Sequence, residues 1–199
     1  QAKKVIVEVN VSQPMSLVGM HDIYEPQDPP YREPFPIKAA GDRIGTDYIP
    51  CDPAKIVAIV PCDVPDTTRP LAPIDDDAKA MSQHLINFFL EEVKAGRLPE
   101  NLLPLQSGVG SVANAVVSGL AEGPFTNLSI FTEVIQDGML DLIDAGKVTD
   151  CSGTALSPSP DGLKRFYDNI DKYSKHILLR PQEISNNPGL ARRLGVITM

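Results

Sequence analysis

A glycine turn and an acidic residue have the residue types and spacing most suited to chemistry in this sequence. Gly108 and Gly110 follow the apolar run 102–106, and Ala113 completes the spacing G-x-G-x-x-A. Glycine lets a backbone approach a ligand closely, and N–H groups at a helix start favour a bound anion or oxyanion. Glu133 follows the next apolar run, 24 residues after Val109. If the two runs are adjacent parallel strands, the turn and the acid lie on the same edge of a sheet.

Two different chemistries fit this arrangement. In a dinucleotide-binding fold the turn holds a pyrophosphate, and Glu133, 20 residues beyond Ala113, contacts a ribose. Pro104 and Gln106 interrupt the apolar strand which that fingerprint prefers, and a long amphipathic segment precedes it. In covalent catalysis Glu133 attacks an activated acyl group, and the turn stabilises the developing oxyanion. A third, purely structural interpretation is that Glu133 caps a helix that starts near Gln136.

Alternating helix and strand patterns after residue 75 predict the scaffold for these residues. Asp75–Asp77 form an acidic helix start, an apolar face runs through Met81, Phe88 and Phe89, and Gly96 ends the helix. In the rest of this part, strands and helices alternate along the chain. The expected strands are 102–106, 127–132, 147–155 and 176–181, and the expected helices between them are 111–121, 136–145 and 161–174. We therefore predict an α/β fold with an open, mostly parallel sheet and flanking helices.

The first part of the chain has a different composition. Twelve of the 19 prolines lie in the first 73 residues. Residues 3–11 and 55–60 read as strands, the second as a continuous apolar run typical of a strand buried on both faces. The proline-rich segment (residues 24–42) is expected to cross a surface as extended chain. The predicted boundaries are 1–66 for the first part, 67–74 for a linker and 75–199 for the second part.

The net charge and the residue content indicate which partners, compartment and ligands are expected for this chain. A net charge of −8 and a pI near 4.8 disfavour a nucleic-acid partner, because phosphates attract a basic face. No apolar run reaches the roughly 20 residues of a membrane span, so no membrane partner is expected. The odd number of cysteines, Cys51, Cys62 and Cys151, favours free thiols in a reducing compartment, the cytoplasm or in a eukaryote the mitochondrion. No histidine has partners at metal-ligand spacing, so no metal is predicted.

Other reactive residue types are interpreted as structural. His21 and Asp22 are neighbours in a motif that precedes the proline-rich segment, where a structural role is expected rather than a catalytic pair. Cys151 stands in no recognised motif and is expected in the core. Arg192 and Arg193 are expected on a helix surface.

Four stretches of the sequence form a recognisable set: GMHDIY, NLLPLQSGVGSVANAVVSGL, FTEVIQDGMLDLIDAGK and QEISNNPGLARRLGVI. Together they resemble the acetyl-CoA hydrolase/transferase family, whose transferases belong to the glutamate-nucleophile class. The resemblance extends from about Val5 to Met199. It implies two tandem open α/β halves with the active site between them, of which this chain, as an internal fragment, holds part of each. It favours CoA chemistry over the dinucleotide interpretation.

The resemblance also implies roles for individual residues. Glu133 is the implied nucleophile, the Val109 N–H donates to the oxyanion, and Asn186 hydrogen-bonds the reacting carboxylates. Gln106, Ser107, Gly108 and Gly110 are implied to contact the substrate or CoA. Some relatives carry an arginine where this chain has Thr67, so Arg69 is the expected substitute that contacts CoA or carboxylate. A second oxyanion donor is expected from a glycine-rich segment beyond residue 199.

The implied reaction is ping-pong transfer of CoA from an acyl-CoA to a small carboxylate. Acetyl-, propionyl- and succinyl-CoA are the candidate donors, CoA is bound as a glutamyl-CoA thioester during the cycle, and the whole protein is expected to be a homodimer. Two alternatives stay open at this point. Water in place of the acceptor makes the same site an acetyl-CoA hydrolase, and a fragment without turnover is a CoA-binding piece.

Overall fold

The computed structural model of the chain describes residues 2–199. Its larger sheet has five strands, all parallel, in the order β8-β6-β4-β3-β9. These strands are β3 (Leu105–Gln106), β4 (Leu128–Phe131), β6 (Val148–Gly153), β8 (Ile177–Leu179) and β9 (Ile197–Thr198). The fold class predicted from the alternating pattern, α/β with an open, mostly parallel sheet and flanking helices, is confirmed.

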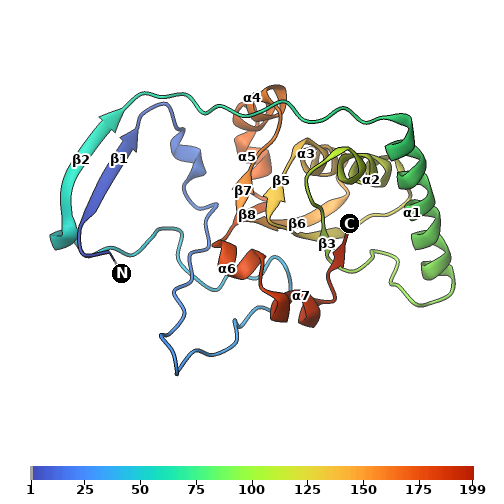
Figure 1. Ribbon diagram of the computed structural model, residues 1–199, viewed down its shortest axis with the longest axis horizontal. Helices are drawn as coiled ribbons and strands as arrows, with labels where there is room; N and C mark the ends of the chain where they lie inside the picture. The colour runs from blue at the N-terminus through green and yellow to red at the C-terminus, as the bar shows by residue number, and fades with distance from the viewer. Residues whose placement is uncertain (1) are drawn as a thin grey trace.

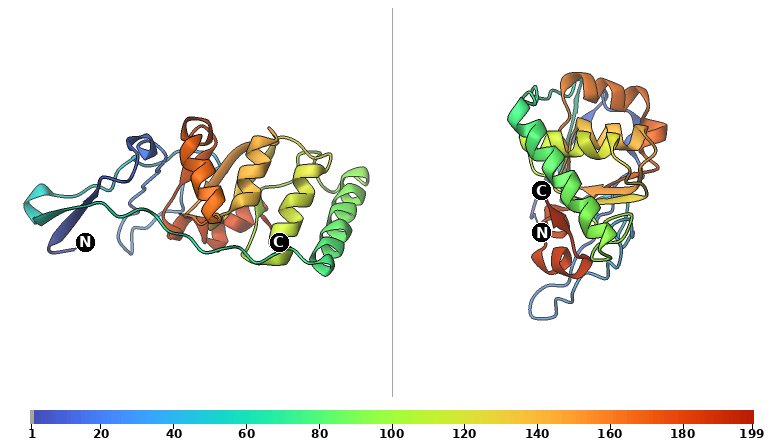
Figure 2. Two further views of the ribbon diagram at one scale, coloured as in Figure 1. Left: turned by 90° about the horizontal axis from the view of Figure 1, so that it is seen from above. Right: turned by 90° about the vertical axis from the view of Figure 1, so that its right-hand side faces the viewer.

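Helices cover both faces of this sheet (Figure 1, Figure 2). One layer is a row of five helices: α1 (Asp76–Lys94), α2 (Ser111–Glu122), α3 (Asp137–Asp144), α4 (Pro160–Asp168) and α5 (Ile170–Tyr173). The opposite side carries two short helices, α6 (Gln182–Ser185) and α7 (Pro188–Leu194). A pair of short parallel strands, β5 (Val134–Ile135) and β7 (Ala155–Leu156), extends beyond the carboxyl ends of β4 and β6.

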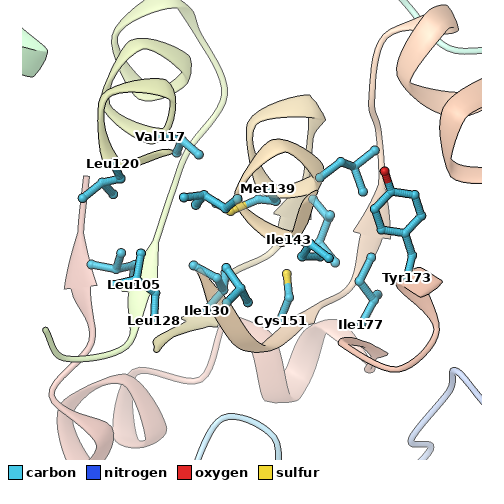
Figure 3. Packing of buried hydrophobic residues seen from close by; sticks show 14 of the residues in the cluster. Leu105, Val117, Leu120, Leu128, Ile130, Met139, Ile143, Cys151, Tyr173 and Ile177 are labelled. Atoms are coloured by element: carbon cyan, nitrogen blue, oxygen red, sulfur yellow. The ribbon is translucent and has the colours of Figure 1, made fainter. Parts of the chain in front are cut away.

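The main core lies between the sheet and the row of five helices. In Figure 3, Leu105, Ile130 and Cys151 project from the strands toward Met139 and Ile143 of α3. A second, smaller cluster on the other face joins the proline-rich segment to α6 and α7 through Phe35, Ile37, Phe131, Ile184 and Leu190. The proline-rich segment has no helix or strand, as predicted, and it contributes these buried apolar residues to the second face.

The start of α1 forms as the sequence predicts, but its buried face differs. The Asp75 side chain accepts a hydrogen bond from the Ala78 N–H at 2.7 Å, and Gly96 follows the helix with φ of +69°. Ile86 and Phe89 are buried against α2, whereas Met81 and Phe88 of the predicted face are more than half exposed. The buried stripe is rotated toward Ala78, Ser82 and Ile86, because contact with α2 rather than apolar content alone selects it.

Several predicted elements are shorter or divided. The strand expected at 102–106 is only β3, because Leu102 has φ of +58° and Pro104 lacks an N–H donor. The helix expected at 161–174 divides into α4 and α5 at Asn169, whose backbone is not helical (φ −128°, ψ 29°). The strand β9 and the helix α6 were not predicted, because each is too short for a periodic pattern. The helix α7 was anticipated only at Arg192 and Arg193, which lie exposed on it as expected.

The interpretation of residues 55–60 as a strand buried on both faces is wrong. The strand β2 (Ile56–Cys62) pairs in parallel with β1 (Val5–Asn10), and its Val57 and Ile59 side chains are 56% and 64% exposed. Figure 1 shows this pair standing apart from the helices that cover the larger sheet. An apolar run predicts a strand that can be covered on both faces, but the described residues provide no such cover. Residues 63–75 then run as extended chain to α1.

Candidate active site

The glycine turn (residues 107–110) lies at the carboxyl end of β3 and leads directly into α2. Gly110 is the residue before the helix, with φ of +132° and ψ of 172°, a backbone conformation available almost only to glycine. Val109 at the tip of the turn is 69% exposed. No acceptor within residues 2–199 bonds its N–H. The turn therefore presents a backbone donor to solvent at the edge of the sheet.

Glu133 lies at the same edge, directly after β4. The strands β3 and β4 are parallel neighbours, with Leu105 opposite Ile130. The Thr132 hydroxyl, which is fully buried, donates to the Ser107 carbonyl at 3.0 Å and so ties the two strand ends together. Ser107 and Gly108 line a space of only about 10 Å³, which shows how closely the turn packs against the chain after β4.

Hydrogen bonds hold the backbone of Glu133, and its side chain extends past the edge of the sheet to Gln182. Its carbonyl accepts hydrogen bonds from the N–H groups of Thr154 at 2.8 Å and Ala155 at 3.0 Å. Glu133 as a residue is half-buried, and its carboxylate accepts one hydrogen bond from Gln182 Nε2 at 3.4 Å, in an exposed position. Gln136, not Glu133, is the residue that directly precedes α3 at the N-cap position, and no side chain caps that helix. The helix-cap interpretation of Glu133 is therefore wrong.

Asn186 and Gln106 line one small cavity on the side of α6 and α7. The cavity has a volume of about 260 Å³, and Phe131, Ser185 and Thr198 also line it. The Ser185 hydroxyl is buried and has no hydrogen-bond partner within residues 2–199. This polar space beside the end of β4 has the size and the donors to hold a small carboxylate.

Arg69 is not brought to this edge. It lies exposed in the extended segment 63–75, and none of its atoms forms a hydrogen bond or ion pair within the described residues. The neighbouring segment is held elsewhere, because the Tyr167 hydroxyl on α4 hydrogen-bonds the Asp66 carboxylate. The geometry gives no support to Arg69 as a ligand-contacting residue.

A cavity of about 860 Å³ was not anticipated from the sequence, and one of its lining residues is Thr154, whose N–H bonds the Glu133 carbonyl. It is lined by segments far apart in the chain, including His21, Tyr24, Arg32, Thr154, Pro181 and Glu183. Burial lowers the pKa of His21 from its ordinary value. Asp22 does not pair with it. The Asp22 carboxylate is buried and accepts the N–H groups of Ile44 and Gly45, so it has a structural role.

The remaining candidates lie away from this edge. Cys151 is fully buried in the core, and burial raises the pKa of its thiol. All three cysteines are free. Within residues 2–199 no three acidic, histidine or cysteine side chains gather as metal ligands. No helix in that range is both long and apolar enough to cross a membrane.

Known proteins resemble this chain in both sequence and fold. The chain is 56% identical to the succinyl-CoA:acetate CoA-transferase of Clostridium kluyveri and 50% identical to the acetyl-CoA hydrolase of Yarrowia lipolytica. Each match covers the whole chain, but only 37% and 38% of the relative. The solved 4-hydroxybutyrate CoA-transferase of Porphyromonas gingivalis superimposes with a TM-score of 0.59 at 18% identity, covering 98% of this chain and 41% of that one.

The fold is thus that of the CoA-transferases. Residues 1–61 match the acetyl-CoA hydrolase/transferase N-terminal domain. With the matches along its whole length, this places the chain in the acetyl-CoA hydrolase/transferase family, as its motifs predict. The chain spans well under half the length of these relatives.

Proposed function

We propose that the protein containing this chain is an enzyme that transfers CoA from an acyl-CoA to a small carboxylate, with Glu133 as the nucleophile. The observation that carries this is the placement of Glu133 beside the glycine turn. The Thr132–Ser107 hydrogen bond joins the two strand ends, and the unbonded Val109 N–H belongs to the turn. A positioned carboxylate next to a free backbone donor is what attack on a thioester carbonyl requires.

The proposed cycle begins when a Glu133 carboxylate oxygen attacks the thioester carbonyl of the acyl-CoA. The C–S bond breaks, CoA leaves as a thiolate, and a mixed anhydride remains on Glu133. The thiolate then attacks the glutamyl carbonyl, releases the acyl group as a carboxylate and leaves a glutamyl-CoA thioester. An acceptor carboxylate attacks this thioester, and the two steps run in reverse. The Val109 N–H stabilises each oxyanion, and Asn186 hydrogen-bonds the carboxylates.

Hydrolysis is the second candidate function, because several relatives are named acetyl-CoA hydrolase. In that reaction water attacks the same glutamyl intermediate, so the roles of Glu133 and Val109 are unchanged. Acetyl-, propionyl- and succinyl-CoA are the proposed donors. The cavity of about 260 Å³ beside Asn186 supports a short acceptor rather than a long one.

The organisation of the whole protein is also proposed. We propose that residues 1–66 and 75–199 belong to two CoA-transferase halves joined by residues 67–74, and that the whole protein is a homodimer in a reducing compartment. Light scattering of the full-length protein tests the dimer directly. CoA is the proposed bound group, and no step uses a metal.

Trapping the intermediate tests the proposed function. The full-length protein is incubated with acetyl-CoA alone and treated with borohydride or hydroxylamine, which attack a glutamyl thioester but not a carboxylate. Peptide mass spectrometry is expected to find the modification at Glu133. Acetyl-CoA consumption that needs added succinate identifies a transferase, and consumption without any added carboxylate identifies a hydrolase. A protein that binds CoA but shows neither consumption nor adduct is a binding protein, and the proposal fails.

A further inference from the structure

The single helical turn α6 carries two carboxamide side chains toward the edge where Glu133 lies. Gln182 Nε2 donates to Glu133 Oε1 at 3.4 Å, and Asn186 lines the cavity of about 260 Å³. The Asn186 N–H bonds the Gln182 carbonyl at 2.8 Å, which closes the turn. Residues four apart on such a turn lie on the same side. The turn thereby presents one carboxamide to Glu133 and one to the neighbouring cavity.

Gln182 is the only residue within the described chain that hydrogen-bonds the Glu133 carboxylate. The Glu133 backbone is held separately, through its carbonyl, by Thr154 and Ala155. Gln182 is therefore the one hydrogen-bond donor among residues 2–199 that can orient this side chain. Hydrogen bonds in ligand-free active sites are often long and shorten when substrate binds, so 3.4 Å is consistent with a working contact.

We propose that Gln182 is a positioning residue that orients the Glu133 carboxylate for attack. This inference rests on the proposed role of Glu133. An N–H donor on one carboxylate oxygen restricts side-chain rotation and leaves the other oxygen free to attack. Because a displacement of about 1 Å lowers rates on the order of 10²-fold, even one orienting contact affects the chemical step.

The test uses Gln182→Ala and Gln182→Glu in the full-length protein. Gln83 provides the matched control, since it is also an exposed glutamine whose Nε2 donates to a side-chain oxygen, Asn87 Oδ1, at 3.0 Å on α1. Gln83→Ala and Gln83→Glu repeat the chemical changes far from the sheet edge. The readouts are the single-turnover rate of glutamyl-CoA formation, KM for acyl-CoA, and the pH dependence of kcat/KM.

Gln182→Ala is expected to slow glutamyl-CoA formation about 10-fold with little change in KM, because one hydrogen bond to a charged group is lost. Gln182→Glu places a second carboxylate beside Glu133. Like charges raise a carboxyl pKa, so the acidic limb of the pH profile should move to higher pH. A carboxylate at position 182 acts on Glu133 through proximity alone, so this shift tests the contact. Slower glutamyl-CoA formation at unchanged KM in Gln182→Ala tests the positioning role. Both Gln83 variants should match the wild-type protein.

The outcomes separate this inference from the proposed function. Wild-type turnover with a Glu133 adduct, together with Gln182 variants that behave like the Gln83 variants, overturns the inference and leaves the proposed function intact. A wild-type protein without turnover or adduct overturns both. Slower adduct formation in Gln182→Ala with an unshifted pH profile in Gln182→Glu also rejects the positioning role, because it indicates general damage to α6.

Discussion

Arg180 and Asp22 face each other inside the protein, with 3.6 Å between Nη2 and Oδ2 and at most 1% of either side chain exposed. Arg180 Nη2 also donates to the carbonyls of Ala40 and Asp42, and Asp22 accepts the N–H groups of Ile44 and Gly45. Burial lowers the pKa of Arg180, and the charge of Asp22 opposes that shift. Through these contacts the pair holds the proline-rich segment against the carboxyl end of β8, and Arg180 also lines the cavity of about 860 Å³.

Removal of Asp22 should therefore destabilise the fold strongly. Asp22→Ala leaves the Arg180 charge buried without its partner and frees two backbone N–H groups, which typically costs about 3–5 kcal/mol. Urea unfolding of the full-length protein measures this change. Glu91→Ala is the control, because its ion pair with Lys94 is about 70% exposed on both sides and should contribute less than about 1 kcal/mol. Equal losses of unfolding free energy in the two variants would contradict the proposed structural role of the Arg180–Asp22 pair.

The alternation of elements after residue 75 is predictable because each helix carries its own local signals. The acidic start before α1, the glycine after it and the apolar runs of β4 and β6 are sufficient to predict the order of elements and a parallel sheet. The proximity of Glu133 and Val109 also follows, since one strand–helix–strand unit places both at the carboxyl edge.

The remaining features depend on contacts between distant segments, which a local pattern does not encode. Whether Ile59 is covered depends on other elements, and its apolar character alone predicts the wrong burial. Gln182 stands in a quoted motif, yet its role appears only when α6 folds back against the end of β4. The cavity of about 860 Å³ joins residues near His21 to residues near Arg180, so no single stretch of sequence indicates it.

The three thiols should react at very different rates. Cys51 is exposed and Cys151 is fully buried, where burial and the nearby Asp150 raise the thiol pKa. Because the thiolate is the reactive form, Cys151 should resist a maleimide at pH 8 until urea is added, whereas Cys51 should react at once. Burial and Glu8 raise the pKa of Cys62, so it should react more slowly than Cys51. Peptide mass spectrometry over time assigns each rate, and native labelling of Cys151 as fast as Cys51 would show that the predicted burial is wrong.

The two glycines of the turn should differ in their tolerance of substitution. Gly110 occupies a conformation with φ of +132° that strains other residues by about 1–3 kcal/mol. At Gly108 an added Cβ would meet only the Met199 carbonyl oxygen, at an ordinary 3.8 Å. Gly110→Ala should move the Val109 N–H and lower kcat on the order of 10²-fold. Gly108→Ala introduces no such backbone strain, so it should lower kcat less than Gly110→Ala does, and a rise in KM would report the implied contact of Gly108 with CoA. An effect of Gly110→Ala on KM alone would indicate that the turn binds CoA without stabilising an oxyanion.

Substitutions of Glu133 distinguish a nucleophile from a structural acid. Glu133→Gln keeps the shape of the side chain but removes the attacking charge, so it should abolish transfer and leave CoA affinity nearly unchanged. Glu133→Asp moves the carboxylate back by about 1 Å and should also impair turnover severely. Glu100→Asp, an exposed loop acid, is the control for the same shortening and should be fully active.

The thermal stability of the Glu133 variants is a second property that distinguishes a nucleophile from a structural acid. Gln136 holds the N-cap position of α3, and within residues 2–199 the Glu133 side chain hydrogen-bonds only Gln182. Neither Glu133 substitution therefore removes a helix cap, and thermal unfolding should be nearly unchanged. A structural acid would show the reverse pattern, because loss of a cap costs about 1 kcal/mol and aspartate would preserve it. Calorimetry and turnover measured on one preparation of each variant therefore test the assignment together. An active Glu133→Asp enzyme would remove Glu133 from the chemistry, and with it the proposed transferase mechanism.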